Sequence, residues 1–265
     1  GRTFRACRQD ALEGAPGRDA EQSIPAAWLL DQTGRVLLGE CVRGEAALRA
    51  VADRQDPDGR LYGVAPGGSE LTVPDWSLLW IVWLAEHVAW TGRLDLAEDL
   101  YPAVERCLEW TAGWRGAAGL LENPSDEPPW WLFLDHSPLA KQGEVTAWQA
   151  LWVRAIGASA DLAGWLGRED EAAAARDEAD QVVRIARDRL FDADRARFVD
   201  GRLFKRVAKE GSPATNYYAL WGGLASDDEA EAILGRLWKD ASTETSDWGA
   251  RENPYVKYFA AEALL

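Results

Sequence analysis

The sequence predicts an all-α fold in which inner helices are surrounded by outer ones. Three observations lead to this prediction. Segments that are apolar on nearly every face alternate with amphipathic segments, the links that follow the apolar segments are short, and the links that precede them are long. A helix that is apolar all round must be buried on all sides, whereas an amphipathic helix covers a core with one face. Such alternation is typical of two concentric rings of helices, an α/α toroid.

The clearest helix covers residues 74–91. Pro74 and Asp75 are typical of a helix start, and Gly92 is typical of a stop. Its apolar residues occupy nearly every face, so the helix is expected to be buried. The next segment, 94–113, has a single apolar stripe among acidic residues, and we expect it to be a half-exposed cover.

The same alternation occurs elsewhere in the chain. Further pairs of helices are expected at 18–31 with 41–54, 144–166 with 168–191, and 213–225 with 227–239. A lone helix is expected to begin near residue 254. The one extended structure that we expect is a small hairpin at 197–204.

The long links indicate where a functional site lies. In a toroid, all links from an outer helix to the next inner helix emerge on one rim, at the N-terminal ends of the inner helices. Loops of this length are usually functional. The long links are 55–73, 114–143, 192–212 and 240–253.

Size and charge exclude several classes of protein. The chain has 265 residues and no Pro/Gly/Ser-rich linker, which predicts a single domain over 1–265. Its formal net charge of −15 would repel nucleic acid and anionic membrane surfaces, so neither is an expected partner. No apolar run is long enough to predict a membrane span. The expected ligand is neutral or cationic.

Cysteine and histidine are scarce. Three cysteines without CxxC spacing and two histidines support neither a disulfide framework nor a metal site. The chain begins at Gly1 and contains no methionine, so we expect that residue 1 is not the natural start.

Tryptophan and carboxylates are abundant, with 15 Trp and 44 Asp and Glu against 29 Lys and Arg. Indole rings stack on the apolar faces of pyranoses, and carboxylates bind sugar hydroxyls or exchange protons at a glycosidic centre. This composition is typical of a protein that handles sugars. Most of the tryptophans are expected in the core, and burial statistics favour a core position over a sugar subsite for Trp76, Trp80, Trp83, Trp148 and Trp152.

The predicted rim brings together acidic, amide and aromatic residues. The starts of the inner helices supply Arg18, Asp19, Asp75, Trp76, Glu144, Asn216 and Tyr255, and the 114–143 loop adds Trp130, Trp131, Asp135 and His136. An inverting glycosidase needs an acid and a base about 6.5–9.5 Å apart, with aromatic walls around the sugar. Helix capping explains Asp75 and Glu144 equally well, and Asp19 with Arg18 also fits an exposed ion pair.

Several segments resemble a known family. In order and spacing, six segments resemble the α-L-rhamnosidases of glycoside hydrolase family 78. These segments are Ala15-Pro16-Gly17-Arg18-Asp19, Pro74-Asp75-Trp76-Ser77-Leu78, Leu100-Tyr101-Pro102, Trp131-Leu132-Phe133-Leu134-Asp135-His136, Gly143-Glu144 and Asn253-Pro254-Tyr255. The resemblance implies a six-hairpin (α/α)6 barrel that hydrolyses terminal α-L-rhamnosides with inversion and without a cofactor. It implies that Asp19 is the general acid. Arg18, Glu13, Asp75, Trp76, Trp130, Trp131, Asp135, His136, Asn216 and Tyr255 are the expected substrate-binding residues.

The sequence departs from the family pattern at the acid. Asp19 replaces the usual Glu, Ala15 replaces a Cys, Gly14 and Ala26 fall where acids are usual, and Glu13 lies one place off. These departures leave open a second hypothesis, a catalytically weakened carbohydrate-binding relative. A third hypothesis is a helical scaffold whose acidic rim contacts a protein.

The base is not assigned by the resemblance within this chain. The family's base is a glutamate late in the barrel, and the chain ends at Ala263-Leu264-Leu265 within an apolar helical pattern. We expect the sequence to be a truncated piece of a longer protein, with the base beyond Leu265. Within the chain, Glu144 is the fallback base, and Asp75 is the other carboxylate that could serve.

Overall fold

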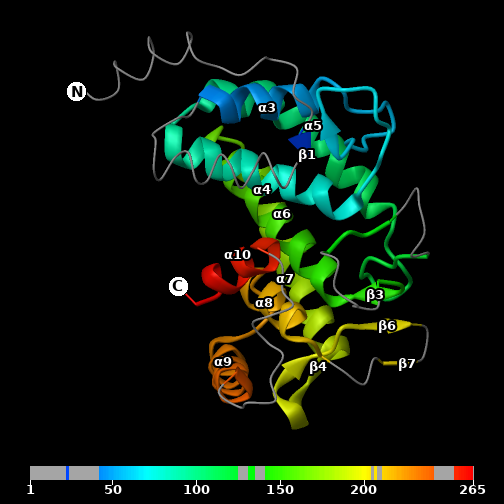
Figure 1. Ribbon diagram of the computed structural model, residues 1–265. Coiled ribbons are helices and arrows are strands. Elements are labelled where there is room, and N and C mark those ends of the chain that lie inside the picture. The colour runs from blue at the N-terminus through cyan, green and yellow to red at the C-terminus, as the bar shows by residue number, and fades with distance from the viewer. Residues whose placement is uncertain are drawn as a thin grey trace.

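The computed structural model describes residues 22–23, 42–124, 131–134, 141–203, 206–207, 211–241 and 254–264. In these ranges the fold is the predicted all-α toroid. The inner helices are α4 (Pro74–Thr91), α6 (Thr146–Trp165), α8 (Pro213–Trp221) and α10 (Pro254–Glu262), and the outer helices are α3 (Val42–Ala52), α5 (Leu94–Ala112), α7 (Glu169–Leu190) and α9 (Asp227–Ala241). α6 packs against α4 and α8, and α8 packs against α10, so successive inner helices lie side by side (Figure 1).

The core lies around the inner helices. Trp80, Trp83 and Trp148 are completely buried, and Trp152 is 1% exposed, which confirms their prediction as core residues. Each indole removes on the order of 200 Å² from water, worth roughly 5 kcal/mol as an upper estimate. Tryptophan abundance therefore reflects, in large part, the packing of the inner helices.

Short links join inner helices to outer ones, as predicted. Gly92 ends α4 with a φ of 69°, and its amide donates to the carbonyl of Val88. This left-handed conformation favours glycine, because a Cβ would strain the backbone there. The chain then enters α5 at once, which holds α5 against α4.

Short strands occur in the long links, and their pairing differs from the hairpin that the sequence predicts. β5 (Arg197–Phe198) pairs with β4 (Phe191–Asp192), whereas β6 (Gly201–Leu203) pairs with β3 (Glu144–Val145) and β7 (Arg206–Val207). A hairpin within 197–204 is therefore wrong. The physical reason is a close approach at Gly201, where a Cβ would lie 2.9 Å from the carbonyl oxygen of Glu144.

The structure also contradicts the helix predicted at 18–31, at the two residues of this range that it describes. Gln22–Ser23 forms strand β1, which pairs antiparallel with β2 (Val64–Ala65). Ladder hydrogen bonds to β2 replace the helical bonds that the local pattern predicted. The rest of 18–31 lies outside the described residues.

The long links gather on one side of the molecule. Figure 1 shows the chain between α3 and α4, the loop before β3, and strands β6 and β7 toward the right of the view. This is the rim predicted from the sequence, because the inner helices α4, α6 and α8 begin where these links end. None of the described helices combines the length and apolarity needed to span a bilayer.

Candidate active site

Asp75 is fully buried in the first turn of α4, and its carboxylate binds the rim loop. One oxygen accepts a hydrogen bond from the amide of Phe133 (2.9 Å), and the other accepts from the amide of Leu134 (3.1 Å). Two successive amides that face one carboxylate form a small anion-binding nest. Asp75 therefore anchors the segment 131–134 to the start of α4.

The anchored segment has an unusual backbone. Leu134 has a φ of 37°, in a region that non-glycine residues seldom adopt. Such a conformation costs on the order of 1–3 kcal/mol and persists only where surrounding contacts impose it. The bond from the Leu134 amide to Asp75 is one such contact.

Burial raises the pKa of Asp75 to about 6, although the amides of Leu134 and Phe133 and the charge of Lys141 act in the opposite direction. Desolvation prevails because the carboxylate has no contact with water. The group is therefore mainly ionised at neutral pH and titrates in mildly acidic solution.

The ammonium of Lys141 acts on this carboxylate through its charge, which lowers the pKa of Asp75. Lys141 is 7% exposed, and its Nζ donates to the carbonyl of Phe133 (2.6 Å). The same ammonium lies 5.7 Å from the centre of the Trp131 ring, within the range of a cation–π interaction. Lys141 thus holds the segment 131–134 from the side opposite to its amides.

Aromatic side chains complete this part of the rim. Phe133 makes edge-on contacts with Trp76, at 5.3 Å between ring centres, and with Trp131, at 5.6 Å. Both indoles are half-buried, and the buried Nε1 of Trp76 has no hydrogen-bond partner among the described residues. We call Asp75, Trp76, Trp131, Phe133 and Lys141 the rim cluster.

Glu144 has a different environment. It is 4% exposed, and both its oxygens accept hydrogen bonds from Arg189 at the end of α7, at 2.5 and 3.0 Å. A bidentate pair of this kind fixes the position and orientation of a carboxylate. The geometry therefore suits an anchor between β3 and α7.

Asn216 is engaged by the main chain. Its Oδ1 accepts from the amide of Phe198 (2.9 Å), and its Nδ2 donates to the carbonyls of Phe198 (3.2 Å) and Ser212 (2.9 Å). The residue is 1% exposed. Both amide hydrogens are thus used to hold β5 against the start of α8.

The structure therefore brings together three of the predicted site residues, Asp75, Trp76 and Trp131, and places Glu144 and Asn216 at other points of the rim. The remaining predicted residues lie outside the described residues: Glu13, Arg18, Asp19, Trp130, Asp135 and His136. Tyr255 lies in α10, but its side chain is likewise outside the description.

Sequence reasoning missed Phe133, Lys141 and Arg189. Phe133 was visible only as part of the family-like run 131–136, and nothing in the spacing of Lys141 or Arg189 marks them as partners of the rim carboxylates. No group of three or more His, Cys, Asp or Glu side chains able to hold a metal ion occurs in the part of the chain that the structure describes.

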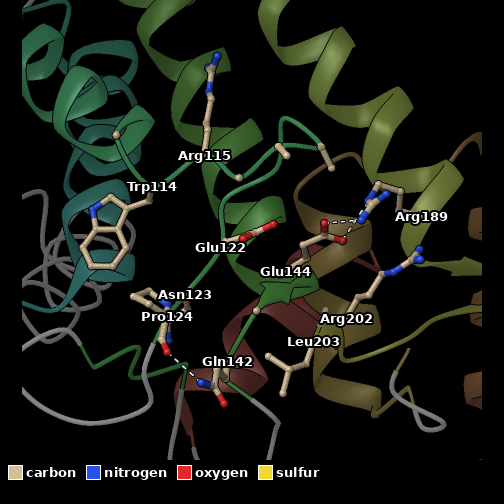
Figure 2. Close-up of a pocket in the computed structure, with 15 residues that line it drawn as sticks. Trp114, Arg115, Glu122, Asn123, Pro124, Gln142, Glu144, Arg189, Arg202 and Leu203 are labelled. Atoms are coloured by element: carbon tan, nitrogen blue, oxygen red, sulfur yellow. Dashed lines mark hydrogen bonds and ion pairs between the residues drawn. The ribbon is translucent and has the colours of Figure 1, made fainter. Parts of the chain in front are cut away.

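A pocket of about 730 Å³ opens on the same rim, between the end of α5 and the end of α7. Trp114, Arg115, Glu122, Asn123, Gln142, Glu144, Arg189 and Arg202 contribute to its walls (Figure 2). Its volume lies within the range of ordinary ligand sites.

Comparison with known families identifies the domain. The profile of the bacterial α-L-rhamnosidase six-hairpin glycosidase domain matches residues 40–249. The chain belongs to this family. No protein with a curated description matches the sequence.

Solved structures share the fold of this α-L-rhamnosidase-type domain. The family 78 rhamnosidase of Bacillus sp. GL1 matches with a TM-score of 0.73 and 20% identity, over 95% of this chain and 29% of that one. A rhamnosidase from Klebsiella oxytoca with rhamnose bound matches with a TM-score of 0.79 and 20% identity, over 93% and 46%. The family 63 mannosylglycerate hydrolase from Thermus thermophilus, in complex with glucose, matches with a TM-score of 0.66 and 14% identity, over 94% and 81%. The chain thus spans less than half the length of the two rhamnosidases, and at these identities the likeness concerns the fold.

Proposed function

We propose that this domain belongs to a glycoside hydrolase that removes terminal α-L-rhamnosyl residues, or closely related sugars, with inversion at the anomeric carbon. The observation that carries the proposal is the family match over residues 40–249, together with the position of the rim cluster at the start of an inner helix. Half-buried indoles beside a buried carboxylate suit a site that binds a sugar ring by stacking and hydrogen bonding.

Asp19 is the proposed general acid. In the proposed reaction its carboxyl group protonates the glycosidic oxygen as the bond to the anomeric carbon breaks, and a base on the opposite face takes a proton from the attacking water. The products are the β-anomer of the free sugar and the alcohol that carried it. Trp76, Trp130, Trp131, Asp135 and His136 are proposed to hold the sugar, with Arg18, Glu13 and Tyr255.

The buried polar residues have a positioning role in this proposal. Asp75 holds the segment that carries Trp131, so its contribution to sugar binding is made through that segment. Glu144 is a poor candidate for the base, because Arg189 engages both of its oxygens in a bidentate ion pair that stabilises the charged carboxylate. We therefore propose that the base is the glutamate that the family carries late in the barrel. The resemblance assigns it to no position among residues 1–265.

The test is hydrolysis by the protein in its natural form, followed by proton NMR. Aryl α-L-rhamnoside, α-D-mannoside and α-L-lyxoside are offered separately, and the anomeric signal of the first product is recorded. The proposal expects release of rhamnose with the β-anomer appearing first. Release of no sugar, or appearance of the α-anomer first, would contradict it.

A carbohydrate-binding relative without hydrolytic activity is the second candidate, and the departures at Asp19, Gly14 and Ala26 favour it. A carboxyl group that is one methylene shorter reaches less far toward a glycosidic oxygen. This candidate predicts that calorimetry detects rhamnose binding while the NMR experiment detects no product.

A further inference from the structure

The pocket beside Glu144 carries charged and polar side chains on both walls, next to apolar residues such as Trp114, Ala117, Pro124 and Leu203. One wall carries Glu144, Arg189 and Arg202, and the other carries Glu122 and Asn123 (Figure 2). The pocket lies on the same rim as the rim cluster, because its walls belong to the links that lead into α6 and α8.

The first wall has a guanidinium with no partner among the described residues. Arg202 stands directly opposite Glu144 in the pairing of β3 with β6, yet Arg189 takes both carboxylate oxygens. The Nε of Arg202 is buried and makes no hydrogen bond within the described part of the chain. Two arginines thus flank one carboxylate, and Arg202 retains hydrogen-bond donors for a ligand.

The second wall offers acceptors. Asn123 is 1% exposed, and its Oδ1 has no hydrogen-bond donor among the described residues, while its Nδ2 donates to the carbonyl of Lys141. The neighbouring Glu122 is exposed and lines the same space. A pocket that holds a guanidinium and these acceptors is complementary to hydroxyl groups, because a hydroxyl both donates and accepts.

Aromatic stacking contributes little to this pocket. The ring of Trp114 makes edge-on contacts with Trp110 (5.7 Å) and Trp148 (5.8 Å), and in Figure 2 it turns away from Glu122 and Glu144. The donors and acceptors of Arg202, Glu122 and Asn123 suit a polyhydroxylated ring.

The pocket and the rim cluster are joined through one loop. Asn123 binds the main chain of Lys141, and Lys141 binds the main chain of Phe133 in the rim cluster. The wall of the pocket and the rim cluster are therefore connected by two hydrogen bonds that meet at Lys141.

We propose that this pocket is a saccharide subsite for the leaving-group side of the substrate, so that the preferred substrate is an oligosaccharide and not a simple aryl glycoside. The choice of sugar as ligand rests on the proposed function. Arg202 donates to the ring hydroxyls, and Asn123 and Glu122 accept from them. Glu144 and Arg189 act by holding the wall in place.

The test compares two substrates in one protein. The ratio of kcat/KM for a neutral rhamnose-terminated tetrasaccharide to kcat/KM for 4-nitrophenyl α-L-rhamnoside is measured for the wild type, Arg202→Gln and Arg184→Gln. Arg184 is an exposed arginine on α7 outside the pocket, which makes it the matched control. We expect the ratio to fall by about tenfold in Arg202→Gln, the effect of losing one hydrogen bond to a charged group, and to stay constant in the control.

A ratio that is the same in Arg202→Gln and in the wild type would overturn the proposal. If the wild type hydrolyses neither substrate, the proposed function fails by itself, and the pocket is tested by calorimetry with the rhamnose-free trisaccharide. Binding that Arg202→Gln weakens by about tenfold then supports the subsite, whereas no binding, or equal binding by the variant, overturns it.

Discussion

Asp75 and Glu144 occupy corresponding places on the rim but have opposite electrostatic environments. Asp75 lies in the first turn of α4, Glu144 lies in β3 directly before α6, and each is at most 4% exposed. Asp75 is satisfied by two backbone amides, and burial raises its pKa to about 6. Glu144 is satisfied by the guanidinium of Arg189.

The difference shows that burial alone does not determine how a carboxylate behaves. Amides stabilise the charge of Asp75 without neutralising it, so desolvation remains the larger effect. A guanidinium neutralises the charge of Glu144, and the pair then depends on both members. One region of the rim is thus sensitive to pH, and the other is sensitive to loss of a partner.

The largest expected effect concerns the Glu144 region. Arg189→Met removes the guanidinium that binds both oxygens of the buried Glu144 carboxylate, and we expect it to lower the free energy of unfolding by about 3 kcal/mol in urea titrations. This is the low end of the usual range, because the Arg189 side chain is 26% exposed. The matched control is Arg195→Met, which breaks an exposed pair with Asp192 and should leave stability unchanged.

The double variant Glu144→Met/Arg189→Met sharpens this prediction. Removal of both charges should recover much of the lost stability, because no uncompensated charge remains. Equal destabilisation by the single and double variants would show that packing of Arg189, and not its charge, matters.

The second effect concerns the pH dependence of Asp75. Its pKa is raised in the folded state from 3.8 to about 6, so the folded protein holds this proton more tightly than the unfolded chain does. Stability should therefore fall as pH rises from about 4 to about 6, by up to about 3 kcal/mol from this group. Because Asp75→Asn cannot titrate, the stability advantage of the wild type over this variant should shrink by that amount between about pH 4 and pH 7.

Asp95 provides a control of opposite sign. A hydrogen bond from Arg93 lowers its pKa to about 2, so its contribution is present above about pH 4 and is lost as pH falls toward 2. As pH rises, the free energy of unfolding of the wild type, measured in urea titrations, should thus fall relative to that of Asp75→Asn and rise relative to that of Asp95→Asn. A constant difference for Asp75→Asn at all pH values would contradict the proposed role of desolvation.

The smallest effect concerns Lys141. Its charge lowers the pKa of Asp75, although less than the amides do. Lys141→Met should therefore move this pKa further upward by a small amount, which carbon-13 NMR titration of the aspartate carboxyl groups can measure. Lys257→Met, at an exposed position on α10, should leave the titration unchanged. A downward shift in Lys141→Met would contradict the electrostatic role of Lys141.

The sequence could predict the helices because their signals are local. The residues of α4 show Pro74 at its start, Gly92 at its end and apolar side chains on every face, and its observed bounds are those predicted. The predicted hairpin at 197–204 failed because the partners of these strands, β3 and β4, come from other links, and local alternation does not reveal them.

The environments of the rim carboxylates could not be predicted for the same reason. Asp75 binds amides 58 and 59 residues away, and Glu144 binds an arginine 45 residues away. The sequence showed that acids stand at helix starts, but helix capping, catalysis and ion pairing all place acids there. Only the fold distinguishes a carboxylate held by amides from one held by a guanidinium.

The most direct test of the proposed glycosidase is Asp19→Asn in the natural protein, with rhamnose release and rhamnose binding measured side by side. The proposal predicts that kcat on a rhamnosyl oligosaccharide falls by at least about 100-fold, because a general acid contributes at least that much, while calorimetry shows rhamnose binding unchanged. Undiminished turnover in Asp19→Asn would contradict the assignment of Asp19 as the acid.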